Sequence, residues 1–216
     1  GKDSVFQSHI LKYKYGMKPL TITWAPIMYT DVGKQNMENW INVGGFDNLL
    51  FTPNGKVLKN LTREAFTNLY FPMQPFKVGI KFWALKMAMK FNIKLVMYGE
   101  PYIEYGSTPL EEWESPKLDL KYFVNDSKDI NLGGLSVKQL KEKYNFNDND
   151  LSPYMPIRSQ EVKGKKTTVE YLGWYLNWDP QEAYYYAADN CNFIPDDHRT
   201  DGTYGKYSSI DDKIDG

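Results

Sequence analysis

The apolar residues of the first hundred positions switch repeatedly between two periods. Some recur at the spacing of one helix face, and others form short continuous runs of the kind seen in buried strands. The pattern predicts strands at 20–24, 48–52 and 94–98 and helices at 5–13, 37–41, 61–70 and 76–91. Strands that alternate with helices in this way form a parallel sheet covered on both faces, which is a Rossmann-like α/β fold.

The pattern changes between residues 107 and 166. This stretch holds an acidic cluster at 111–114 and a polar run at 145–150, which we expect to be a loop. Ser136 and Gln139 have the spacing of a capping box, which predicts a short helix that ends near Tyr144. We interpret the stretch as an insertion within one domain that spans residues 1–216.

Regular α/β patterning resumes after the insertion. β-branched and aromatic residues predict a strand within 167–178. Asp179, followed by Pro180, is a strong helix start and predicts a helix over about 182–189. The tail from residue 199 to 216 has turn chemistry without periodicity.

Composition narrows the class of protein. The chain has 26 basic and 27 acidic residues, so no bulk charge favours a nucleic acid or a membrane. The single cysteine, Cys191, excludes an internal disulfide framework, and His9 and His198 are too few for a histidine-rich metal site. Lysines interrupt the longest apolar stretches. We expect a soluble, cytoplasmic protein with neither a nucleic-acid nor a membrane partner.

The first four residues carry the clearest candidate chemistry. Gly1-Lys2-Asp3-Ser4 runs directly into the first predicted helix, and a glycine before a helix start suits an anion-binding N-terminus. Capping of the helix by Asp3 or Ser4 is the simpler alternative. A Walker-type loop is disfavoured, because the Asp3 carboxylate would sit against the phosphates.

Three predicted strands end near this turn. Ligands of parallel α/β sheets bind beyond the carboxyl ends of the strands, which here are Trp24, Thr52 and Gly99-Glu100. We expect all three ends to face the same crevice as Asp3 and Ser4.

The residues of this turn also carry a family resemblance. Gly1 to Ser4 match the last four positions of the Ser-Gly-Gly-x-Asp-Ser loop of the PP-loop ATP pyrophosphatases. The rest of the chain resembles the N-acetyl sugar amidotransferases, which belong to that superfamily and work in bacterial surface-polysaccharide and flagellin-glycan synthesis. The similar segments lie at 24–26, 29–31, 45–48, 51–55, 61–63, 74–76, 98–100, 104–106, 199–204 and 206–216.

The resemblance implies an ATP-dependent conversion of a sugar's N-acetyl group to an acetamidino group. The acetamido oxygen would attack the α-phosphate of ATP, and ammonia would then displace AMP from the adenylated imidate. The implied partners are an N-acetylated sugar, of the nucleotide or sialic type, and a glutaminase subunit that supplies ammonia. A glutaminase needs a cysteine nucleophile with a histidine base, and we interpret the single cysteine, Cys191, as structural.

The resemblance also implies roles for particular residues. Pyrophosphate would lie on Gly1, Lys2, Asp3 and Ser4. The candidate catalytic carboxylates are Asp3, Glu100 and Glu104, and Asp3 with Glu100 would hold Mg²⁺ together with phosphate oxygens.

Three further implied contacts are less specific. The backbone around Thr23 and Trp24 would receive adenine. Arg63 and Lys77 would bind phosphate or a sugar anion, and a surface ion pair is the alternative for each.

The chain departs from the family pattern before Gly1. The first strand of the sheet, the leading Ser-Gly of the loop and the cysteine-rich N-terminal segment of the family are missing. A sheet without its first strand would expose two long edges. We therefore expect this chain to be a portion of a longer polypeptide.

Two other classes of function stay open. Another PP-loop enzyme, a tRNA thiolase or an ammonia-dependent synthetase, would share the ATP site. A tRNA enzyme should show a basic insertion, whereas residues 111–114 are acidic. A non-enzymatic carbohydrate-binding module would explain the 6 tryptophans, 17 tyrosines and 11 phenylalanines, although aromatic residues more often fill a core.

Overall fold

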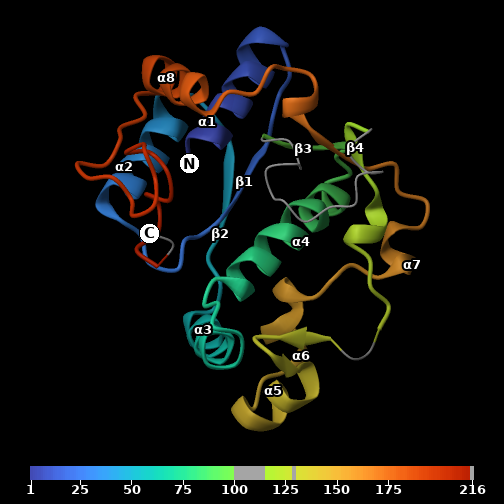
Figure 1. Ribbon diagram of the computed structural model, residues 1–216. Coiled ribbons are helices and arrows are strands. Elements are labelled where there is room, and N and C mark those ends of the chain that lie inside the picture. The colour runs from blue at the N-terminus through green and yellow to red at the C-terminus, as the bar shows by residue number, and fades with distance from the viewer. Residues whose placement is uncertain (100–114, 128–129, 215–216) are drawn as a thin grey trace.

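The computed structural model describes residues 1–99, 115–127 and 130–214. Figure 1 shows an α/β arrangement in which helices surround short strands. The helices are α1 (Lys2–His9), α2 (Asp31–Asn42), α3 (Gly55–Leu69), α4 (Gln74–Lys90), α5 (Val137–Tyr144), α6 (Asp148–Leu151), α7 (Ser159–Val162) and α8 (Pro180–Cys191). The strands are β1 (Thr21–Trp24), β2 (Asn48–Phe51), β3 (Leu95–Tyr98), β4 (Lys117–Leu118), β5 (Asn131–Leu132), β6 (Leu135–Ser136) and β7 (Thr168–Tyr171).

The described strands form small, separate sheets. β1 pairs in parallel with β2, and β3 pairs in parallel with β7, which also carries the antiparallel β4. β5 and β6 form a short hairpin. The α/β class is therefore confirmed, whereas the single sheet expected from the sequence is not seen, because no pairing joins β1 to β3 within the described residues.

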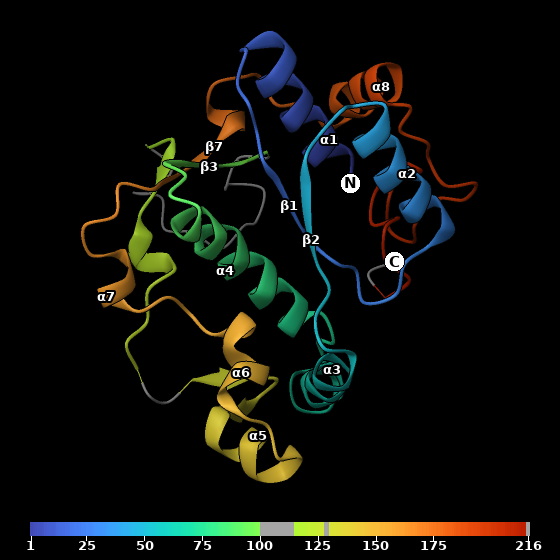
Figure 2. The same ribbon diagram turned by 180° about the vertical axis from the view of Figure 1, so that it is seen from behind.

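Helices lie on both sides of β1 and β2. Figures 1 and 2 show α1, α2 and α8 on one side and α4 on the other. The first side has a core of Val5, Trp40, Phe46, Ala187, Cys191, Phe193 and Ile210. The second side has a core of Trp24, Val57, Leu61, Leu132, Leu140, Leu151 and Tyr154. The two cores cover β1 and β2 only in part, because Leu49 and Leu50 of β2 are exposed.

Three helix starts follow from side-chain caps. The Ser136–Gln139 capping box is present and begins α5, and Asp179 accepts hydrogen bonds from the backbone of α8's first turn. Both were predicted. α3 begins at Gly55, earlier than the predicted start at 61, because the Asn54 side chain accepts from the Lys56 N–H at 3.0 Å.

Two predicted boundaries are wrong. The polar run 145–150 was expected to be a loop, but Asn147 and Asp150 form a reciprocal capping box that starts α6. The strand predicted within 167–178 is confined to β7, because a 3₁₀ turn begins at Leu172.

The predicted insertion supplies a small subdomain. Its helices α5 and α6 and the β5–β6 hairpin lie beside α3 and one end of α4 (Figures 1 and 2). Leu132, Leu140 and Leu151 pack with Leu61 of α3. The acidic cluster 111–114 lies outside the described residues. Among the helices that the structure describes, none has both the length and the apolar character of a membrane span.

The tail folds back onto the loop after β1. The carboxylate of Asp212 is buried and accepts hydrogen bonds from the backbone N–H groups of Ile27, Met28 and Ile214. Backbone hydrogen bonds from Thr30 to Asp211 and from Lys213 to Met28 add an isolated bridge between the two segments. The tail is thus fixed by side-chain hydrogen bonds and one isolated bridge and not by a regular helix or strand, which explains why its sequence shows no periodicity.

Candidate functional site

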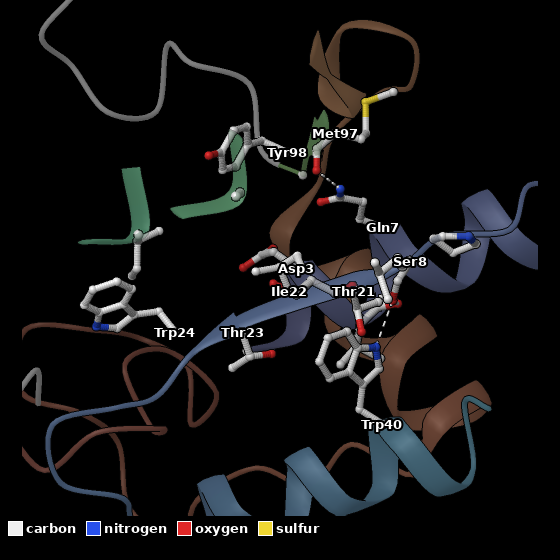
Figure 3. Close-up of a pocket in the computed structure, with 18 of the residues that line it drawn as sticks. Asp3, Gln7, Ser8, Thr21, Ile22, Thr23, Trp24, Trp40, Met97 and Tyr98 are labelled. Carbon is white, nitrogen blue, oxygen red and sulfur yellow. Dashed lines mark hydrogen bonds between the residues drawn. The ribbon is translucent and has the colours of Figure 1, made fainter. Parts of the chain in front are cut away.

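A cavity of about 1020 Å³ lies between β1 and β3. α1, α2 and α4 supply the rest of its wall, so it is bounded by segments from the first half of the chain together with a few residues of the tail. Figure 3 shows Ile22 of β1 and Met97 and Tyr98 of β3 around the same space. This volume is at the upper end of ordinary ligand pockets, which hold about 300–1,000 Å³.

The first turn of α1 opens onto this cavity. Gly1, Asp3 and Ser4 line it, and Asp3 points toward the space between β1 and β3 in Figure 3. Gly1 is the N-cap, and no side chain caps the helix among the described residues. The first turn therefore has the positive end of a helix without a capping side chain, and the Asp211 carboxylate lies 3.0 Å from the Gly1 nitrogen.

Lys2 points away from this cavity. Its side chain is buried, its Nζ lies 2.6 Å from Asp3 Oδ1, and it stands 5.4 Å from the centre of the Tyr207 ring. Lys2 is not among the residues that line the cavity. The Lys2 ammonium group therefore forms an ion pair with Asp3 and a cation–π contact with Tyr207. The ion pair offsets the negative charge of Asp3.

Thr23 and Trp24 both line the cavity. The Thr23 hydroxyl donates to Asn48 Oδ1 on β2 at 2.9 Å. The Trp24 ring packs on α4, where a Cβ on Gly79 would lie 2.3 Å from the ring. The Trp24 side chain is thus core, and a ligand at this strand end would meet mainly its backbone.

The end of β3 approaches α1 closely. A Cβ on Gly99 would lie 2.9 Å from Gln7 Oε1 and 3.0 Å from the Trp178 ring, so glycine permits this approach. The same Cβ would lie 3.4 Å from the Asp3 carbonyl oxygen, so the end of β3 meets the first turn of α1, as expected from the sequence, whereas Thr52 does not line the cavity. The predicted carboxylates Glu100 and Glu104 lie outside the described residues.

Arg63 and Lys77 do not join the other candidates. Arg63 on α3 and Lys77 on α4 are exposed, and neither lines the cavity. Lys77 Nζ lies 5.2 Å from the centre of the Phe71 ring. The structure brings together Gly1, Asp3, Ser4, Thr23 and Trp24 and leaves these two basic residues elsewhere.

Two residues at the cavity were not identified from the sequence as candidates. Gln7 donates through its side chain to the Met97 carbonyl on β3 (Figure 3). Asp211 Oδ2 lies 3.0 Å from the amino nitrogen of Gly1. The i, i+4 spacing of Gln7 from Asp3 places both on one face of α1, which was an available signal for Gln7. Asp211 lies in the similar segment 206–216, but that resemblance gave it no role in the site.

Two tyrosines that line the cavity have raised pKa values. Burial raises the pKa of Tyr98, whose hydroxyl has no hydrogen-bond partner among the described residues. Burial, with Asp211 and Asp212 nearby, also raises the pKa of Tyr29. Both hydroxyls are therefore neutral donors at physiological pH.

The carboxylates of the described ranges 1–99, 115–127 and 130–214 do not form a ready-made metal cluster together with histidine or cysteine. Asp3 is the carboxylate that the first turn of α1 offers. In comparisons with known proteins, the chain matches no family model and no curated protein.

Proposed function

We propose that this chain is an ATP-dependent N-acetyl sugar amidotransferase of the PP-loop type, with its nucleotide site at the mouth of the cavity. One observation carries the proposal. Gly1, Asp3 and Ser4 come from a helix start, Thr23 and Trp24 from a strand end, and all five line the same cavity. A helix N-terminus beside the carboxyl ends of parallel strands is where nucleotides bind in α/β proteins.

The proposed reaction has two displacements. The acetamido oxygen of the sugar attacks the α-phosphorus of ATP, and the bond to pyrophosphate breaks. Ammonia then adds to the imidate carbon, the carbon–oxygen bond breaks, and AMP leaves with that oxygen. In the acetamidino product, the new C–N bond replaces the former C–O bond. Activation is needed because an amide oxygen is a poor leaving group, so catalysis consists of alignment and stabilisation of phosphate charge.

The chain's own residues supply the anion-binding part of this site. Backbone N–H groups of Gly1 to Ser4 and the exposed Ser4 hydroxyl hold the pyrophosphate oxygens. The backbone at Trp24 receives adenine. Lys2 keeps Asp3 in position through the 2.6 Å contact between Nζ and Oδ1.

Mg²⁺ fits this donor set. It binds one or two carboxylates and takes its other ligands from phosphates and water, so a cluster of three protein ligands is not needed. Asp3 is partly exposed, and it contacts Lys2 through Oδ1. The ion would neutralise phosphate charge next to the Asp3 carboxylate. Glu100 is the proposed second carboxylate.

The test is incubation of the protein with ATP, Mg²⁺, ammonium and N-acetyl sugars of the nucleotide and sialic types. We expect AMP and pyrophosphate in equal amounts, together with the mass change caused by replacing an amide oxygen with NH. Release of ADP, or AMP formation that does not depend on the sugar, would contradict the proposal.

A matched pair of variants assigns the activity to the site. Asp3→Asn should lower AMP formation by on the order of 100-fold, as loss of one charge-stabilising group does. Asp31→Asn is the control, because Asp31 is an exposed aspartate in the first turn of α2. An equal effect of both variants would show that the cavity is not the site.

Nucleotide binding separates the enzyme from a carbohydrate-binding module. Titration with ATP and Mg²⁺ should give a binding signal that Asp3→Asn weakens and Asp31→Asn does not. A module that recognises sugars through aromatic side chains would bind the sugar alone, and Asp3→Asn would leave that binding unchanged.

A further inference from the structure

A second cavity, of about 340 Å³, lies between the tail and the start of α2. Thr30, the N-cap of α2, forms one wall, and residues within 196–201 and 209–213 form the rest. Figure 1 shows the tail beside α2. Ser209 and Asp212 also line the larger cavity between β1 and β3, so the two cavities share a wall. The volume is near the lower end for ligand pockets, about 300 Å³, and therefore suits a small molecule.

The walls of this second cavity are held in place by hydrogen bonds and by the core. The Asp196 N–H donates to the Lys206 carbonyl at 2.7 Å, and the Thr200 hydroxyl donates to the Ser208 carbonyl at 2.6 Å. Ile210 is 3% exposed and packs in the core that α1, α2 and α8 share. The cavity is therefore formed without a ligand, which lowers the cost of ordering its side chains on binding.

Two permanent cations line this cavity, Arg199 and Lys213. Both are exposed, and within residues 1–99, 115–127 and 130–214 neither side chain has a hydrogen-bond or ion-pair partner. The backbone of Lys213 is fixed, because its N–H donates to the Met28 carbonyl at 2.8 Å. The guanidinium group of an arginine offers a planar fork of donors that matches a carboxylate. These two side chains are therefore available to an anionic group.

Three carboxylates line the same cavity, those of Asp196, Asp201 and Asp212. Asp212 already accepts hydrogen bonds from three backbone N–H groups, and Asp196 accepts from two. The Asp201 side chain, by contrast, has no hydrogen-bond or ion-pair partner in the described part of the chain. An ionised carboxylate only accepts hydrogen bonds, so Asp201 is suited to the hydroxyl groups of a ligand.

This mixture of charges distinguishes between possible ligands. A doubly charged phosphate would pair with the two cations but would also lie against the carboxylates, which repel it. A singly charged carboxylate forms a bidentate pair with arginine and meets less repulsion. A divalent cation is not favoured either, since the described histidine, cysteine, aspartate and glutamate side chains form no group that could hold a metal ion.

We propose that this second cavity binds a small carboxylic acid that carries hydroxyl groups. The ligand carboxylate pairs with Arg199 and Lys213, and a ligand hydroxyl donates to Asp201. The bound acid lies next to the larger cavity, across the wall that includes Ser209 and Asp212. This inference does not depend on the proposed enzyme activity, because binding needs neither ATP nor turnover.

The test is titration of the isotope-labelled chain with D-gluconate, followed by NMR. The amide signals of Arg199, Asp201 and Lys213 should shift together and saturate with one dissociation constant. Two matched probes separate the parts of the ligand. D-sorbitol has the hydroxyl groups without the carboxylate, and acetate has the carboxylate without the hydroxyl groups. Each should bind on the order of 10-fold more weakly, or less tightly still, than D-gluconate.

Variants assign the binding to this cavity. Arg199→Gln should weaken D-gluconate binding by on the order of 10-fold or more, because a charge-assisted bidentate pair is lost. Asp201→Asn should weaken the binding of D-gluconate and not that of acetate. Arg63→Gln is the control, because Arg63 is an exposed arginine of α3 that lines neither cavity. All three side chains are exposed, so each variant should keep the thermal midpoint of the unmodified chain.

Three results would overturn the proposal: no saturable shift with D-gluconate, tighter binding of inorganic phosphate than of D-gluconate, or equal weakening by Arg199→Gln and Arg63→Gln. Failure of the proposed enzyme activity is a separate result. Binding of D-gluconate as described, in a protein that forms no AMP with any sugar, would remove the proposed enzyme and support this site.

Discussion

The α3–α5 region and the space between β1 and β3 differ in how completely side chains fill them. Leu61 and Leu140 are 0% exposed, and the buried Glu64 carboxylate accepts from Lys143, Tyr144 and Asn68. Between β1 and β3, strand edges are unused and apolar side chains surround a large cavity. The insertion and α3 therefore pack into one shared core, whereas the space between β1 and β3 is left unfilled, and the candidate site lies at that open centre.

The two regions should differ most in the free energy of unfolding that is lost when one apolar side chain in each is truncated. Leu61→Ala should lower the free energy of unfolding by about 2–5 kcal/mol, because it leaves a void in a packed core. Ile22→Ala should cost less than about 1 kcal/mol, because the Ile22 side chain already borders an open cavity. Urea denaturation measures both, and equal losses would contradict the comparison.

Removal of the buried Glu64 charge should have the next largest effect on the free energy of unfolding. Glu64→Gln should lower the free energy of unfolding by about 1–3 kcal/mol, since the amide cannot accept all three donors equally well. Glu142→Gln is the control, because Glu142 is an exposed residue of α5 that stands 3.9 Å from Lys138. A loss as large in the control would show that the Glu64 cluster is not what joins α3 to the insertion.

The same carboxylate should make stability fall in acid. Hydrogen bonds from Lys143 and Tyr144 hold the pKa of Glu64 below its ordinary value. Its stabilisation is present above the unfolded pKa, about 4.3, and is lost as the pH falls through the lower folded pKa. Glu64→Gln should flatten this part of the curve of stability against pH. An unchanged curve would mean that other carboxylates cause the acid loss.

A separate effect of pH on stability is expected in alkali at the junction between α4 and the 3₁₀ turn after α6. Lys86 donates to the carbonyls of Ser152 and Met155, and burial lowers its pKa to about 8. Between that value and the unfolded pKa of about 10.4, the unfolded chain binds more protons, so stability should rise with pH. Lys86→Met should remove this rise, and a rise that persists in the variant would assign it elsewhere.

Much of the fold could be predicted from the sequence because its cues are local. The Ser136 capping box and the Asp179 helix start each depend on residues within one turn. The same local rules fix α6, which was missed because Asn147 and Asp150 were interpreted by their polarity alone.

The separate sheets and part of the site could not be predicted from local patterns, because they depend on contacts between distant segments. Strand pairing depends on contacts between distant segments, such as Leu95 with Thr168, and no local pattern specifies them. Asp211 reaches Gly1 only because the tail folds back on Asp212. The convergence of Asp3 with Trp24 was predictable, because strand ends of one α/β unit share an edge.

The open centre is tested most directly by amide hydrogen exchange along β1 in the unmodified chain. The account predicts alternation: the N–H of Thr23, which faces β2, exchanges slowly, and the N–H of Ile22, which faces the cavity, exchanges fast. Equal, slow exchange at Thr23 and Ile22 would show that both edges of β1 are paired and would contradict the account.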